Sequence, residues 1–168
     1  ENVIKNESLG SSTLNLNSRG IIILLKNKSS YTKALENYDF IPSENDEESP
    51  CLSDPLTEGG LNITNGILTI TLNYWYSCGS WFTNSNSYKF RYQENKFKLI
   101  GLDCREMHRA SGEATEISIN FLTKKKKVTT GINEFNESTP KVKWENIKLS
   151  HLYDLNISKE ILSNLIQY

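Results

Sequence analysis

Cys104 and His108 have the residue types of a nucleophile and its base, and they lie four positions apart beside Asp103 and Glu106. Such a pair catalyses only when a third group orients the base, and a metal site needs three or four ligands. We expect the surrounding residues 103–112, D-C-R-E-M-H-R-A-S-G, to form a loop. The spacing supplies half of a catalytic or metal site, so we predict no catalytic residue, metal or cofactor there.

Glu113 and Glu116 have the residue types of a glycosidase acid and base, which must flank one glycosidic bond. Glu116 precedes Ile117 in a predicted strand, whereas Glu113 follows Gly112 in the predicted loop. Nothing in the neighbouring sequence marks either carboxyl group as the acid or the base. A cell-wall or glycan-active hydrolase that uses either of these pairs is therefore kept as the alternative function.

Aromatic side chains are concentrated between residues 74 and 82. If Tyr74 faces the core, strand alternation turns Trp75 to the opposite face. Trp75 and Trp81 would then form an exposed platform that stacks on a sugar ring or fills a pocket of a protein partner. The alternative is a sheet covered on both faces, with these rings in the core, since large apolar residues are usually buried.

Acidic residues gather in the longest predicted loop, residues 41–58, where three prolines exclude regular structure. The cluster lacks the D-x-[DN]-x-[DN]-G spacing of a calcium loop, which favours a solvated acidic surface or a contact for a basic partner. The candidate contact residues are Trp75, Trp81, Glu47, Glu48, Arg105, His108, Arg109 and Glu113.

The elements that position these residues are predicted to be antiparallel strands. Asn65-Gly66 is a strong hairpin signal because both central residues of a type I′ turn need a positive φ. A second turn at Glu94-Asn95 follows an alternating run. Further strands are expected at 21–25 with 31–36, 117–122, 128–130 and 142–149, with a turn over Lys124–Lys127. Ser158 is a plausible N-cap for a short C-terminal helix.

The predicted fold class is therefore mainly β, an antiparallel sheet of consecutive hairpins with a short C-terminal helix. Residues 1–18 are predicted to be an extended lead-in, and residues 19–168 a single β-rich domain. A net charge of −1 argues against a nucleic-acid partner, and no apolar run is long enough to span a membrane. Because the chain begins at Glu1 without methionine, we expect that a preceding segment has been removed.

Three cysteines, Cys51, Cys78 and Cys104, leave one thiol unpaired if two are bridged, and none lies in a C-x-x-C pair. Cys51 and Cys78 lie in turn-like contexts that suit a link between a loop and a strand end. Three reduced, buried cysteines are the alternative, because free cysteine is often buried.

Four motifs, P-C-L-S-D-P-L-T-E-G-G (50–60), N-Y-W-Y-S-C-G-S-W (73–81), Y-K-F-R-Y-Q-E-N-K-F-K-L-I-G (88–101) and S-G-E-A-T-E-I-S-I-N-F-L-T (111–123), resemble a group of uncharacterised bacterial proteins. That group is typically exported to the periplasm or cell surface, and the resemblance covers most of residues 19–132. It implies a β-rich fold and favours a Cys51–Cys78 disulfide with Cys104 free. Relatives often carry a D-L-N-x-D-G-type segment upstream, which this chain lacks, so a calcium role is not implied.

We therefore expect an exported bacterial binding domain, periplasmic or extracellular, whose partner is a protein, such as a toxin or hydrolase that it restrains in the envelope. A glycan is the other possible ligand. The contacts are expected on two loops, Glu44–Glu58 and Arg105–Glu113, together with Trp75 and Trp81.

Overall fold

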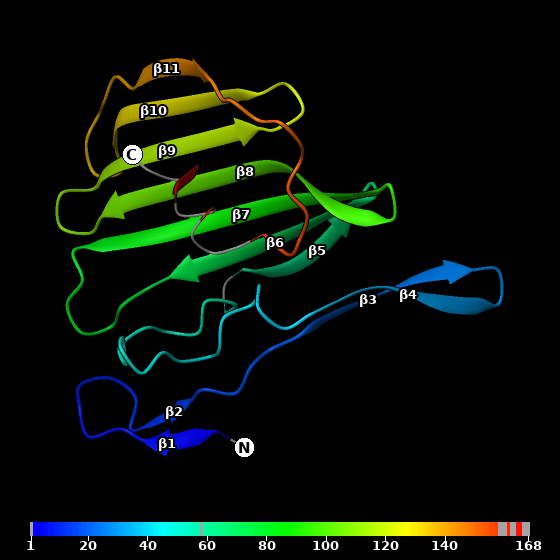
Figure 1. The fold of residues 1–168 in the computed structure, drawn as a ribbon. Coiled ribbons are helices and arrows are strands. Elements are labelled where there is room, and N and C mark those ends of the chain that lie inside the picture. The colour runs from blue at the N-terminus through cyan, green and yellow to red at the C-terminus, as the bar shows by residue number, and fades with distance from the viewer. Residues whose placement is uncertain (1, 58, 158–160, 162–163, 166–168) are drawn as a thin grey trace.

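The computed structural model describes residues 2–57, 59–157, 161 and 164–165, and their regular secondary structure is almost entirely antiparallel β-strand (Figure 1). A seven-stranded sheet has the strand order β11-β10-β9-β8-β7-β6-β5. Each strand pairs with its neighbour in the sequence, which confirms the predicted series of hairpins. The strands are β5 (Gly60–Thr64), β6 (Ile67–Tyr74), β7 (Phe82–Gln93), β8 (Lys96–His108), β9 (Glu113–Asn120), β10 (Lys125–Asn133) and β11 (Lys141–Asn146).

Two tight turns set the register at the centre of this sheet. Asn65 and Gly66 join β5 to β6 with φ values of 52° and 73°. Glu94 and Asn95 join β7 to β8 with φ values of 53° and 58°. Positive φ at both central residues matches the right-handed twist of the flanking strands. Both hairpins predicted from the sequence are therefore present.

One face of the sheet carries the core. Alternate residues of each strand turn to the same face, and here these are apolar. The buried side chains include Leu68, Ile70, Leu72, Tyr88, Phe90, Leu102, Cys104, Ile117 and Ile119. A register shift opposite Lys89 and Phe90 places Ile100 as an extra residue in β8. Leu99 and Leu102 are three residues apart and would point to opposite faces of a regular strand. The bulge allows both to face the core.

The opposite face of the sheet is polar, and we call it the polar face. Its side chains hydrogen-bond across the strands. The Thr71 and Ser87 hydroxyl groups lie 2.9 Å apart, and Ser118 donates to the Asp103 carboxylate over 2.6 Å. Lys89 pairs with the same carboxylate. Alternation of apolar and polar residues along the sequence thus separates a packed face from a solvated one.

The predicted hairpin at 21–36 is confirmed as β3 (Ile21–Asn27) and β4 (Ser30–Asn37), but it forms its own two-stranded sheet. Its base packs on the core through Ile21 and Leu35. Its tip extends past the end of the main sheet (Figure 1), and Ile22 and Leu24 of β3 are exposed.

Residues 1–18 contain more structure than the predicted extended lead-in. β1 (Val3–Lys5) and β2 (Thr13–Asn15) form a small antiparallel sheet, and Leu14 is only 2% exposed. The Asn15 backbone N–H donates to the Asn45 side chain over 2.8 Å, which ties this sheet to the 41–57 loop. The division into a lead-in and a single domain stays a prediction.

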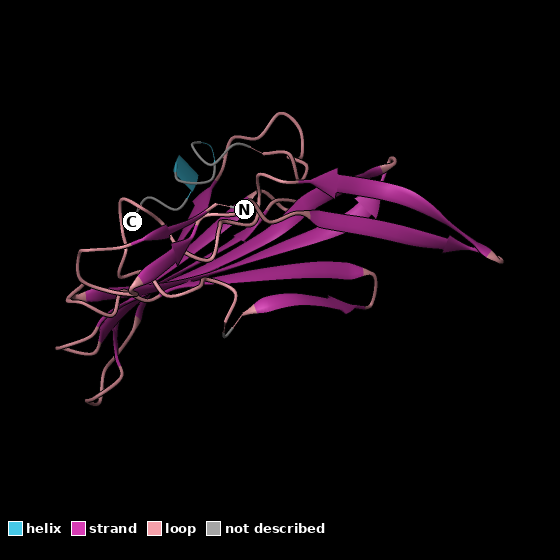
Figure 2. Ribbon diagram, turned by 90° about the horizontal axis from the view of Figure 1, so that it is seen from below, coloured by secondary structure: helices cyan, strands magenta, loops and turns pink. Residues whose placement is uncertain are grey.

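The segment after β11, which passes in front of the sheet in Figure 1, packs on the apolar core and extends the sheet beside the first residues of β8. Figure 2 shows the strands from below, with loops on the upper side of the sheet. The Leu99 N–H donates to the Tyr153 carbonyl over 2.8 Å, and the Leu155 N–H donates to the Phe97 carbonyl over 3.0 Å. Leu155 is buried in the core. The helix predicted from Ser158 falls mostly outside the described residues, which include only 161 and 164–165 of it.

Three boundaries differ from the prediction. Residues 103–108 are not a loop, because β8 continues to His108. Its polar side chains in this region point to the solvated face or extend past the end of the core. The run Lys124–Lys127 is a turn only at Lys124, where φ is 55°, because β10 begins at Lys125. The last strand ends at Asn146 rather than continuing to Leu149.

Candidate functional site

Exposed aromatic residues meet where β7 begins and β8 ends. Phe82 and His108 are directly opposite each other across these strands. The His108 ring stacks on Trp81, with 5.7 Å between centroids and a 12° interplanar angle, and meets Phe82 edge-on at 5.0 Å. Trp81 is 64% exposed and Phe82 45% exposed. The rings therefore support one another while presenting much of their surface to solvent.

Arg109 joins Trp75 to this group. Its guanidinium carbon lies 3.8 Å from the Trp75 ring centroid, a cation–π contact. The same guanidinium donates to the carbonyls of Tyr76 and Ser80 over 3.0 and 3.1 Å. We call Trp75, Trp81, Phe82, His108 and Arg109 the aromatic end.

A covalent link holds the aromatic end against the 41–57 loop. Cys51 and Cys78 form a disulfide with 5.6 Å between their Cα atoms, and Cys104 is free and buried. The Ser77 N–H donates to the Cys51 carbonyl over 2.8 Å, and the Ser53 N–H donates to the Trp75 carbonyl over 2.9 Å. The loop therefore runs beside the end of β6 as an irregular edge segment.

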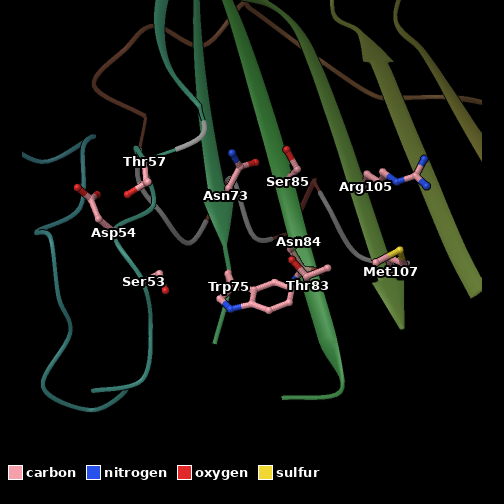
Figure 3. A pocket seen from close by; sticks show the side chains of 10 residues that line it. All are labelled: Ser53, Asp54, Thr57, Asn73, Trp75, Thr83, Asn84, Ser85, Arg105 and Met107. Atoms are coloured by element: carbon pink, nitrogen blue, oxygen red, sulfur yellow. The ribbon is translucent and has the colours of Figure 1, made fainter. Parts of the chain in front are cut away.

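A groove with a volume of about 470 Å³ lies between residues 53–57 of this loop and the polar face of β6, β7 and β8 (Figure 3). We call it the polar groove. Asn73, Ser85 and Arg105 lie in one cross-strand row, and Trp75 lies just past the end of β6. Arg105 is ion-paired with both Glu116 and Glu134.

The structure brings together only some of the predicted contact residues. Trp75, Trp81, His108 and Arg109 form most of the aromatic end, and Arg105 lines the polar groove. The conservative alternative, that both tryptophans lie in the core, is wrong, because Trp75 is 43% exposed.

Of the acidic candidates, Glu113 adjoins the aromatic end, where it lines a small pocket with Phe82 and His108, whereas Glu47 and Glu48 lie elsewhere. Glu113 accepts a hydrogen bond from Ser111 over 3.2 Å, and the Ser111 hydroxyl lies 2.9 Å from the His108 ring nitrogen. Glu47 and Glu48 are exposed in the 41–57 loop. Neither belongs to the aromatic end or the polar groove.

The residue pairs considered for hydrolysis are not brought together. Cys104 and His108 lie on the same face of β8 but are separated by four strand residues, about 13 Å of rise. Cys104 is 3% exposed, and burial raises its pKa to about 12. Glu113 and Glu116 are three residues apart in β9 and therefore point to opposite faces of the sheet.

Two features of the site were missed by sequence reasoning. Asn73 and Ser85 line the polar groove, yet each is an ordinary polar residue in an alternating strand. Phe82 was noted only as part of the aromatic run. The available signal was the alternation of Thr69, Thr71 and Asn73 with leucine and isoleucine, which marks one solvated face without saying what borders it.

Within the described ranges, no group of three or more His, Cys, Asp or Glu side chains could hold a metal ion. No helix in this part of the chain is long and apolar enough to cross a membrane. Comparison with known proteins adds no assignment: no protein-family model, curated protein or solved structure matches the chain.

Proposed function

We propose that the protein is an exported binding domain that docks on a protein partner through the aromatic end. The observation that carries the proposal is the exposure of Trp81, Phe82 and Trp75 in one cluster with Arg109. Tryptophan, tyrosine and arginine are enriched among the residues that dominate binding energy at protein interfaces. Large aromatic rings left in water at one end of a small sheet gain the most from burial against a partner.

Rigidity supports the same proposal. Arg109 holds Trp75 from one side and donates to two backbone carbonyls of the 76–80 turn. The Cys51–Cys78 disulfide fixes that turn to the neighbouring loop. Side chains that are already ordered lose little conformational entropy on binding, so more of the contact energy contributes to affinity.

The disulfide also supports export, because disulfides persist in oxidising compartments and are rare in the cytoplasm. In the envelope or outside the cell, a small domain with a rigid aromatic end suits the inhibition of a toxin or a hydrolase. We therefore propose an inhibitor or immunity-type role. The hydrolase alternative loses its structural basis, since neither of its residue pairs is brought together.

Photo-crosslinking in the source cells tests this proposal. A photoreactive phenylalanine analogue at Phe82 should trap one envelope protein, whereas the same analogue at exposed Leu122, in the turn between β9 and β10, should not. The trapped protein is identified by mass spectrometry and purified for binding measurements with the unlabelled domain. Equal trapping at both positions would contradict a specific contact.

The affinity measurement uses two tryptophans that are both 64% exposed. Trp81→Ala should weaken binding of the purified partner by about thirtyfold, equivalent to roughly 2 kcal/mol. Trp144 lies on the edge strand β11, and Trp144→Ala should bind the partner within about twofold of the wild-type affinity. If both variants bind like the wild type, the aromatic end is not the docking surface.

A further inference from the structure

We propose that the polar groove is a second site, which binds a neutral saccharide across β6, β7 and β8. It lies on the polar face and shares only Trp75 with the aromatic end, so the inference goes beyond docking on a protein partner. Its volume of about 470 Å³ falls within the roughly 300–1,000 Å³ usual for small-molecule sites.

The first argument is the supply of hydrogen-bonding groups. Asn73 pairs with Ser85 across β6 and β7, and Ser85 pairs with Arg105 across β7 and β8. The residues that carry an amide, a hydroxyl and a guanidinium thus lie side by side on neighbouring strands, which are about 4.8 Å apart. Figure 3 shows the Asn73 and Ser85 side chains projecting from neighbouring strands, with Ser53 and Thr57 on the facing loop.

The Asn73 amide and the Ser85 hydroxyl are available to a ligand, whereas the Arg105 guanidinium is already paired with Glu116 and Glu134. The side chains of Asn73 and Ser85 make no hydrogen bond to the part of the chain that the structure describes. Elsewhere on the polar face, by contrast, Thr71 bonds to Ser87, and Ser118 bonds to Asp103. An amide and a hydroxyl can each donate and accept, which matches the hydroxyl groups of a sugar.

The second argument is the indole beside this row. Trp75 lines the groove and is 43% exposed, while Arg109, which stacks on its ring, is not among the lining residues. The ring is therefore a partly exposed wall of the groove, and its contact with Arg109 holds it in place. A pyranose has an apolar C–H face that packs on such a ring while its rim hydroxyls bond to polar side chains.

Local charge decides between saccharide classes. The Asp54 carboxylate is paired with Arg19, whose guanidinium nitrogens donate over 2.7 and 3.1 Å. Arg105 is bound by two carboxylates, those of Glu116 and Glu134. The groups around the groove therefore carry no excess positive charge. Phosphorylated, sulfated and uronic sugars would meet repulsion, so the ligand is a neutral sugar.

The test titrates the folded, disulfide-bonded protein with three neutral oligosaccharides: cellohexaose, chitohexaose and maltohexaose. Calorimetry and tryptophan fluorescence should detect binding of at least one. Trp75→Ala should weaken that binding by about tenfold or more. Asn73→Ala removes an amide without touching the Arg109 contact and should weaken it by about fivefold.

Matched controls separate this site from the aromatic end. Trp81→Ala should bind the oligosaccharide within about twofold of the wild type, even if it loses the protein partner. Trp144→Ala should also leave sugar binding unchanged. Near-ultraviolet circular dichroism and thermal unfolding confirm that each variant is folded.

Four outcomes would overturn the inference. The first is that none of the three oligosaccharides binds. The second is that a sulfated hexasaccharide binds in their place. Alternatively, Trp75→Ala and Asn73→Ala, both folded, bind as tightly as the wild type. Loss of sugar binding in Trp81→Ala but not in Asn73→Ala would move the sugar to the aromatic end and would also overturn it.

Discussion

At the scale of single residues, Asp54 holds the loop that borders the groove. Partial burial of the Asp54 carboxyl raises its pKa, but the Arg19 guanidinium and the Leu56 N–H outweigh that effect, so the net pKa lies below its usual value. A carboxyl whose pKa is lowered by folding stabilises the fold above its unfolded pKa of about 3.9. This stabilisation disappears as the pH falls through the folded value.

We therefore expect Asp54→Asn to lose about 1–2 kcal/mol of unfolding free energy at pH 7. The difference from wild type should shrink as the pH is lowered below about 4. Urea denaturation followed at several pH values measures both effects. Glu47→Gln, an exposed carboxyl in the same loop, should change stability by less than about 0.5 kcal/mol. A pH-independent loss in Asp54→Asn would argue against the Arg19 pairing.

Cys104 gives a second prediction at this scale. Burial, and to a lesser degree Asp103, raises the thiol pKa to about 12, so hardly any thiolate exists at pH 8. The native protein should react with no equivalent of a thiol reagent at that pH, and the protein unfolded without reductant should react with one. Rapid reaction of the native protein would mean that Cys104 is accessible.

Some of these residues could be predicted from the sequence and others could not, because strand alternation is local whereas the packing of segments on one another is not. Strand alternation correctly sets Trp75 opposite Tyr74, because that relation is local. Whether another segment covers the face that carries Trp75 depends on contacts between residues far apart in the sequence, which a local pattern does not reveal. The same limit explains why Asn73 and Ser85 were overlooked, since the loop that faces them is brought there by the rest of the fold.

At the scale of elements, the turns are where sequence and structure agree most closely. Gly66 has a φ of +73°, and an added Cβ would meet no atom within 4 Å. The cost of Gly66→Ala should therefore come from the backbone alone, about 1 kcal/mol. Asn95 has a φ of 58°, so Asn95→Gly should be neutral or slightly stabilising.

Chemical denaturation of the two turn variants provides the check. If Gly66→Ala is as stable as the wild type, the Asn65-Gly66 turn does not have this conformation in solution. Gly112→Ala serves as a comparison, because its Cβ would lie 2.7 Å from the Phe135 ring in addition to a positive φ of 72°. It should be the less stable of the two alanine variants.

Strand ends were harder to predict than turns. Residues 103–108 were expected to be a loop because they are mostly polar and contain no clear apolar alternation. They are nonetheless strand, since β7 and β9 pair with them on both sides. Hydrogen bonding between these strands continues past the end of the core. There neither face of the sheet is buried, so the strand needs no apolar side chains.

At the scale of the whole molecule, consecutive hairpins made the order of the main sheet predictable, whereas the packing of separate segments on it was not. The 41–57 loop, the β3–β4 hairpin and the segment after β11 are all placed by long-range contacts. The Cys51–Cys78 disulfide is the covalent form of such a contact, closing a loop with a sequence separation of 27. Turn-like contexts made both cysteines candidates, the resemblance favoured their pairing with Cys104 free, and the structure confirms that pairing.

This link leads to the prediction with the largest effect on stability. Loop-closure entropy assigns a disulfide of this span about 3–4 kcal/mol, because it restricts the unfolded chain. The double variant Cys51→Ser/Cys78→Ser should lose about that much in urea denaturation, and reduction of the wild type should have the same effect. Because the bridge anchors the turn that Arg109 bonds to, the Trp75 and Trp81 signals in near-ultraviolet circular dichroism should also weaken. Equal stability of the wild type with and without reductant would remove both the structural role of the bridge and the argument for export that rests on it.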